Sequence, residues 1–109
     1  MKRGVIKFMF DFKEKVIDRS NHVPVLVEIS SPGCGPCWWM EKALISVTRK
    51  MDGKVEFVSL PINDYPELVD QYQIKSNPTT LLIKGGTEVG RLNGALPEIV
   101  IEQWVNDNL

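Results

Sequence analysis

The sequence contains few of the residues from which metal centres and structural cross-links are made. Its 109 residues include two cysteines and one histidine. A structural zinc site needs four ligands, so one copy of the chain cannot complete a Cys/His site by itself. The two cysteines stand only three positions apart, and a disulfide across so short a loop removes little entropy from the unfolded chain. The pair is therefore better suited to a redox centre than to a structural cross-link.

An excess of either charge is also missing. The chain has 13 Lys and Arg against 14 Asp and Glu, with no basic cluster. A surface that binds a phosphate backbone needs clustered positive charge. The sequence therefore argues against nucleic acid as a partner.

Long apolar runs are absent as well. No window approaches the ~18 apolar residues of a membrane span. The basic start of the chain has the charge of a secretory signal, but Lys7 and Asp11 cut the apolar stretch short. If Met1 is the native start, we expect a cytoplasmic protein with no membrane segment. In a reducing cytosol, two cysteines separated by two residues indicate catalysis or metal binding rather than a permanent bridge.

The first half of the chain alternates strand and helix patterns. Residues 5–9 predict a short strand, and Asp11 with Glu14 has the spacing of a capping box that opens a helix. Residues 23–29 form an apolar, β-branched run typical of a strand covered on both faces, with Glu28 as its anomaly. Apolar residues then recur at helical spacing, at positions 37, 40, 44, 47 and 51, before Gly53. We expect this helix to begin at the cysteines.

The second half predicts a strand, a short helix, a hairpin and a final helix. Residues 55–60 form the strand, and residues 63–67 supply a cap, an early proline and an acidic first turn for a helix ending near Tyr72. Gly85-Gly86 provides the tight turn of a hairpin over residues 79–93.

Pro97 opens the final helix, whose apolar stripe is Val100, Ile101, Trp104, Val105 and Leu109. We find no linker, repeat or low-complexity stretch. Residues 1–109 are therefore expected to form one α/β domain, with a mixed sheet of four to five strands and helices on both faces.

The cysteine pair lies in Ser31-Pro32-Gly33-Cys34-Gly35-Pro36-Cys37, between the apolar strand and the helix. Helix N-termini stabilise negative charge, so we expect a lowered pKa for Cys34 and assign it as the nucleophile. Cys37, on the apolar stripe, is expected to be shielded, with a raised pKa, and to resolve the mixed disulfide. In the active-site loop, Pro36 suits the first helical turn, and Gly35 allows the turn before it to tighten.

These residues resemble the thioredoxin family. The resemblance covers essentially the whole chain and extends beyond Cys-Gly-Pro-Cys in the family's order and spacing. It includes Tyr72-Gln73-Ile74-Lys75-Ser76-Asn77-Pro78-Thr79, Lys84-Gly85-Gly86, Gly94-Ala95-Leu96 and the tail from Trp104 to Leu109. The resemblance implies a thioredoxin fold and a thiol-disulfide oxidoreductase that reduces protein disulfides, with no cofactor or metal of its own.

The resemblance also implies a substrate-binding surface. Pro78 corresponds to the family's cis-proline that faces the cysteines, although a cis X-Pro bond is a minority state in folded proteins. Asn77 would offer its backbone to an extended substrate segment, and Gly94 would lie beside it. The implied partners are proteins that contain disulfides and a thioredoxin-reductase-type electron donor.

Glu28 falls where the family carries a buried aspartate beneath its active site. Burial raises the pKa of a carboxyl group, so Glu28 is expected to accept the proton of Cys37 as a proton relay. Ser59 replaces the lysine that neighbours this acid in the family, which removes a positive charge and pushes the pKa of Glu28 further upward. Alternatively, Glu28 is a strand-end residue whose carboxyl group reaches water.

Aromatic residues around the cysteines depart from the family pattern. Gly33 stands where the family usually has tryptophan, whereas Trp38 and Trp39 follow the second cysteine. We expect Trp38 to be exposed near the sulfurs, either as a docking residue for substrate or as an idle surface aromatic. Lys42 replaces a mid-helix proline and predicts a straighter helix. His22 is expected to be a solvated turn residue.

Several alternatives remain open for the redox pair. One alternative is an inert buried pair of cysteines. Another is half of a zinc site that two copies of the chain share. A glutathione-dependent glutaredoxin has the same fold and the same cysteine spacing. A non-enzymatic adaptor of this fold would instead use its redox state to switch partner binding.

Overall fold

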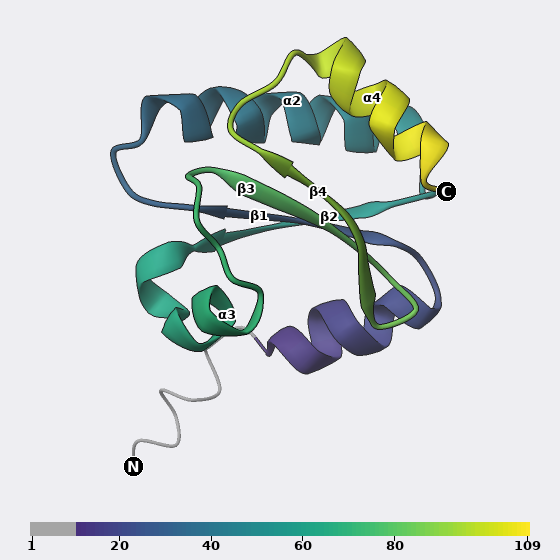
Figure 1. Cartoon of the computed structure of the whole chain (residues 1–109). Helices are drawn as coiled ribbons and strands as arrows, with labels where there is room; N and C mark the ends of the chain where they lie inside the picture. Colours follow the sequence, from purple (N-terminus) through teal and green to yellow (C-terminus); the bar gives the residue numbers. More distant parts are fainter. Residues whose placement is uncertain (1–10) are drawn as a thin grey trace.

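The computed structural model describes residues 11–109 (Figure 1). The strand expected over residues 5–9 lies outside the described residues. The elements follow in the order η1 (Lys13–Asp18), η2 (Arg19–Asn21), β1 (Val25–Ser30), α2 (Gly35–Met51), β2 (Glu56–Pro61), η3 (Ile62–Asp64), α3 (Pro66–Gln71), β3 (Thr79–Lys84), β4 (Thr87–Asn93) and α4 (Glu98–Asp107).

Within the described residues, the sheet has four strands in the order β2-β1-β3-β4. β1 runs parallel to β2 and antiparallel to β3, and β3 and β4 form the expected hairpin. Helices α2 and α4 lie over one face of this sheet, while η1 and α3 lie over the other (Figure 1). The expected mixed sheet with helices on both faces is confirmed.

Side chains of β1 alternate between two hydrophobic cores, because successive residues of a strand point to opposite faces. Val25, Val27 and Ile29 pack in the core on the η1 and α3 face. Leu26 packs in the other core, with residues of α2 and α4. Glu28 therefore points toward the α2 face, where it is fully buried.

Helix α2 has the bounds and the buried face that the periodicity predicts. Cys34 is its N-cap residue, and its buried residues are those of the predicted stripe, Cys37, Met40, Leu44, Val47 and Met51. The helix is continuous through Lys42, where the family has a proline. At its end, Asp52 and Gly53 both adopt positive φ, at 47° and 88°. This left-handed pair ends the helix.

Other elements differ in detail from the sequence predictions. The first helical segment is a π-helix, although Asp11 does accept a hydrogen bond from the Glu14 backbone N–H at 3.2 Å. Tyr65 is the N-cap residue of α3, without a side-chain cap. Val100 belongs to the predicted apolar stripe of α4, yet its side chain is 44% exposed, whereas Ile101 and Val105 are fully buried.

Within residues 11–109, the structure contains no helix that is both long enough and apolar enough to span a membrane.

Candidate active site

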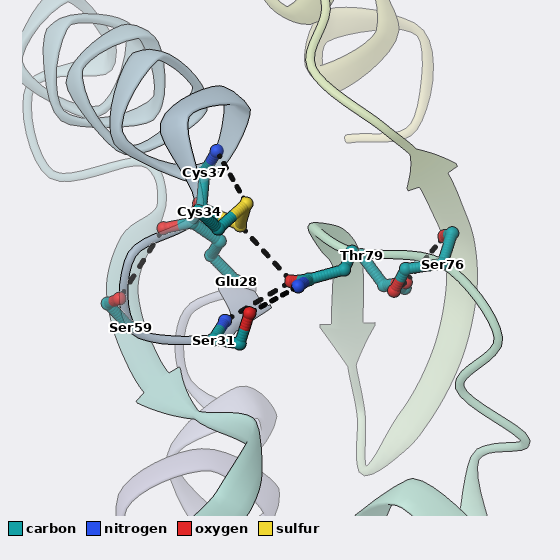
Figure 2. Close-up of a disulfide and its surroundings, with 8 residues drawn as sticks. Glu28, Ser31, Cys34, Cys37, Ser59, Ser76 and Thr79 are labelled. Atoms are coloured by element: carbon teal, nitrogen blue, oxygen red, sulfur yellow. Dashed lines mark hydrogen bonds between the residues drawn. A yellow bond between two sulfur atoms is a disulfide. The ribbon is translucent and has the colours of Figure 1, made fainter.

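The two cysteines form a disulfide at the N-terminal end of α2 (Figure 2). Cys34 is half-buried, whereas the side chain of Cys37 is only 5% exposed. The backbone N–H of Cys37 donates a hydrogen bond of 3.1 Å to Cys34 Sγ. A donor directed at this sulfur, together with the helix N-terminus, favours negative charge on Cys34. The two sulfurs thus occupy different environments although they belong to one loop.

The tight turn before Cys34 is made by Gly33. Its φ is 77°, in the left-handed region that disfavours other residues, and a Cβ there would meet no atom within 4 Å. The backbone conformation, rather than a lack of space, therefore requires glycine where the family usually has tryptophan. Our assignment of this turn to Gly35 was wrong, because Gly35 is already the first residue of α2.

The loop that carries Pro78 lies opposite the cysteines. The Asn77–Pro78 peptide bond is cis, as the resemblance implied. Gly94 lies beside it, because its N–H donates a hydrogen bond of 2.8 Å to the Pro78 carbonyl oxygen. Pro78 is buried, whereas Asn77 is exposed. Asn77, Pro78 and Gly94, three of the residues predicted to bind substrate, therefore lie next to one another.

The side chain of Asn77 makes contacts that sequence reasoning missed, because it considered only the backbone of this residue. Oδ1 accepts a hydrogen bond of 3.2 Å from the Ser31 backbone N–H, and Nδ2 donates a short one to Ser31 Oγ. Oδ1 also lies 3.1 Å from Cys37 Sγ. Nothing in the spacing of residues 46 positions apart signals such a contact.

Glu28 belongs to a row of polar side chains across three adjacent strands. It lies opposite Ser59 of β2 and Thr80 of β3 in the sheet register, and opposite residues point to the same face. Ser59 Oγ donates a hydrogen bond of 3.4 Å to Glu28 Oε1. Glu28 Oε2 and Thr80 Oγ1 are buried without a hydrogen-bond partner among residues 11–109. Figure 2 shows Glu28 and Ser59 of this row on the side of the sheet where Cys34 and Cys37 lie.

The environment of Glu28 favours its protonated form. Burial raises its pKa to about 7, the negative charge of Glu41 adds to this effect, and the Ser59 hydrogen bond opposes it. The direction agrees with the sequence prediction. The side chain is fully buried, so the alternative in which its carboxyl group reaches water is wrong.

Trp38 lies on the exposed side of α2, one residue after Cys37. Its side chain is 51% exposed and that of Trp39 is 66% exposed. The two indole rings meet edge to face, with centroids 4.9 Å apart. The ammonium group of Lys42 lies 4.7 Å from the centroid of the Trp38 ring, which is a cation–π contact. The predicted docking residue therefore has partners that hold it, and still presents half of its surface to solvent.

No cluster of three or more metal-ligating side chains occurs within the described part of the chain. His22 caps the end of η2. It lines a surface hollow with Gly53 and Leu109, at the C-terminal end of α2.

Known proteins resemble this chain over most of its length. The model of the thioredoxin family matches residues 5–107. Thioredoxin 1 of a Nostoc species is 34% identical over 98 residues, which span 90% of each chain. A Synechocystis thioredoxin is 37% identical over 83% of this chain and 82% of its own length. Thioredoxin of Haemophilus influenzae is 31% identical over 91% of each chain.

Proposed function

Because the chain belongs to the thioredoxin family and is a thiol-disulfide oxidoreductase that reduces protein disulfides, we propose that Cys34 is its nucleophile and Cys37 its resolving thiol. The observation that supports this assignment is the asymmetry of the pair. Cys34 is the more exposed residue and accepts the Cys37 N–H, whereas Cys37 lies on the buried stripe of α2.

In the first step, the Cys34 thiolate attacks one sulfur of a substrate disulfide. The new S–S bond joins Cys34 to the substrate, and the other substrate sulfur leaves with the electron pair of the broken bond. The open helix N-terminus and the Cys37 N–H hold negative charge at Cys34 before the attack.

In the second step, Cys37 loses its proton and attacks Cys34 Sγ. The bond between Cys34 and the substrate breaks, the second substrate sulfur leaves as a thiolate and takes up a proton, and the Cys34–Cys37 disulfide forms. Counting the proton that Cys34 releases when it ionises, and the proton that the first substrate sulfur takes up, two electrons and two protons pass in total from the dithiol to the substrate.

Glu28 is proposed as the group that accepts the Cys37 proton. Its pKa of about 7 allows it to be either protonated or ionised near neutral pH. Among residues 11–109, Glu28 Oε2 and the neighbouring Thr80 hydroxyl have no hydrogen-bond partner, so two polar atoms are free inside an otherwise apolar layer. A bridging water would need such polar partners.

Substrate is proposed to dock across the loop of Asn77 and Pro78, with Gly94 and Trp38 at its margins. Asn77 is exposed and Gly94 is hydrogen-bonded to Pro78, so an extended segment can approach the backbone here. Trp38 offers a large aromatic surface next to Cys37. Gly35 and Pro36, the first two residues of α2, are proposed to set the spacing between the two sulfurs.

Membership of the family implies disulfide-containing protein substrates and a reductase as electron donor. We propose a flavin-dependent reductase of the thioredoxin-reductase type for the donor. A cytoplasmic location is part of the same proposal, since a reducing compartment keeps such a pair available as a dithiol.

Insulin reduction by dithiothreitol tests the proposed cycle. The wild type is expected to accelerate it, and Cys34→Ser is expected to abolish the acceleration. Equal acceleration by both proteins would contradict the assignment of Cys34. Cys37→Ser should accumulate mixed disulfides on Cys34, which peptide mass spectrometry detects, because the resolving thiol is gone.

A further inference from the structure

The carboxamide of Asn77 has a fixed orientation at the redox pair. Ser31 offers it one donor, the backbone N–H, and one acceptor, Oγ. A rotation of the amide by 180° would place its NH₂ group against the Ser31 N–H, where two donors would face each other and the hydrogen bond to Oδ1 would be lost. The acceptor Oδ1 is therefore the atom that faces Cys37 Sγ, at 3.1 Å.

We propose that the Asn77 carboxamide is a working part of the redox centre, which accepts the Cys37 thiol proton in a hydrogen bond and shifts the redox equilibrium toward the dithiol. Ser31 is the positioning residue that aims Oδ1 at the sulfur. The proposal rests on the proposed dithiol/disulfide cycle.

The chemical reason is that only one redox state can make this bond. Reduction of the disulfide adds two electrons and two protons, so each sulfur gains one of each. The proton on Cys37 Sγ can then be donated to Asn77 Oδ1, at a distance within the range for a sulfur donor. A disulfide sulfur carries no hydrogen, so the oxidised state gains nothing comparable. The contact therefore stabilises the reduced pair relative to the oxidised pair.

The same loop offers a matched control. Ser76, next to Asn77 in sequence, lies 2.8 Å from Thr79 Oγ1 and donates a hydrogen bond of 2.9 Å to Asn93 Oδ1. Figure 2 shows Ser76 and Thr79 on the side of the loop away from the cysteines. Ser76→Ala therefore removes hydrogen bonds of the loop without removing a group that faces a sulfur.

The test is the equilibrium of the full chain with defined ratios of reduced and oxidised glutathione, with thiols counted by alkylation and mass spectrometry. Asn77→Leu is expected to shift the equilibrium constant about fivefold toward the disulfide, the effect of one typical hydrogen bond, which is about 20 mV for a two-electron couple. Ser31→Ala should shift it about twofold in the same direction, because the backbone N–H still holds Oδ1. Ser76→Ala should leave the constant unchanged.

A second variant at the same position is expected to shift the redox equilibrium in the opposite direction. In Asn77→Asp, the carboxylate is a stronger acceptor for the Cys37 thiol, and the Ser31 hydroxyl can turn to donate to it. The equilibrium is therefore expected to move toward the dithiol, and this near-isosteric variant keeps the test available if Asn77→Leu does not fold.

The proposal is overturned if Asn77→Leu leaves the constant unchanged or shifts it toward the dithiol. For a leucine variant that does not fold, an unchanged constant or a shift toward the disulfide in Asn77→Asp overturns it. Failure of the proposed cycle is a separate result, because the wild type would then not accelerate insulin reduction at all.

Discussion

The two ends of helix α2 differ in what surrounds them. At its N-terminal end, Cys34 is half-buried, and nearby lies the buried carboxyl group of Glu28, whose Oε2 has no hydrogen-bond partner among residues 11–109. At its C-terminal end, a left-handed pair ends the helix, and Lys50 forms ion pairs with Glu98 at 2.6 Å and Glu102 at 3.4 Å on α4. The buried polar groups at the N-terminal end destabilise the folded state, whereas the contacts at the C-terminal end stabilise it.

The comparison separates substitutions that affect chemistry from those that affect stability alone. Functional sites commonly hold groups that destabilise the fold, so their removal can stabilise the protein while it impairs the reaction. We expect substitutions that stabilise the protein and impair the reaction at the N-terminal end of α2 only.

Glu28→Gln gives the largest expected change in stability. The folded-state pKa of about 7 lies above the usual value of 4.5, so the folded state binds more protons than the unfolded state between these pH values. The contribution of Glu28 to stability is therefore fully present below about pH 4.5, falls as the pH rises toward 7, and levels off above it. Glu28→Gln should remove this slope and be more stable at pH 8 by about 3 kcal/mol. Urea unfolding at pH 4, 6 and 8 measures the difference.

Thr80→Val is the matched control for this variant. It removes the neighbouring unpartnered hydroxyl in nearly the same volume, yet it leaves the ionisable group in place. The pH slope of the wild type should persist in Thr80→Val. If the slope persists in Glu28→Gln as well, another group causes it and the assignment to Glu28 is wrong.

Gly53→Ala tests the other end of the helix. A residue with a side chain at φ 88° is strained even where space is available, so we expect a loss of about 1–2 kcal/mol in the free energy of unfolding. The insulin reduction rate of the folded variant should equal that of the wild type. A slower rate in the folded protein would show that the two ends of α2 are coupled.

Trp38→Ala should weaken docking of protein substrates. Loss of the exposed ring next to Cys37 is expected to lower kcat/KM for insulin about threefold, as for a modest interface contact. The rate with a small aromatic disulfide serves as the control, since such a substrate does not reach over the helix. Equal losses with both substrates would assign Trp38 to the fold of the loop instead of to docking.

Lys50→Ala gives the smallest expected effect. Its ion pairs lie at the surface, so they contribute little and are screened by salt. We expect a fall in Tm of about 1–3 °C at low salt, which shrinks in 1 M NaCl. A fall that salt does not reduce would assign the loss to packing of the lysine stem.

The comparison of the two ends also shows what the sequence could predict. Periodicity identified the buried face of α2 down to Met51, because a helix that packs on a sheet buries one stripe. The resemblance supplied the cis bond at Pro78. Both kinds of signal are local along the chain or shared within a family. They sufficed for the strands β1 to β4 of the described residues and for the position of the two cysteines at the start of α2.

Other features depend on contacts that no local pattern specifies. The Asp11 capping signal indicates where a helix begins, yet the same signal precedes a π-helix here. The bridge from Asn77 to Ser31 joins two loops that only the finished sheet brings together. Val100 fits the apolar stripe of α4, but the part of that helix that contacts the core is narrower than the stripe, so Val100 stays exposed.

The relative reactivity of the two thiols tests the central claim most directly. The fully reduced wild type is treated with limiting iodoacetamide at pH 7, and peptide mass spectrometry quantifies the adduct on each cysteine over time. Because Cys34 is more exposed and lies at the helix N-terminus, it should react at least about tenfold faster than Cys37. Equal rates, or faster reaction at Cys37, would contradict the assignment of nucleophile and resolving thiol.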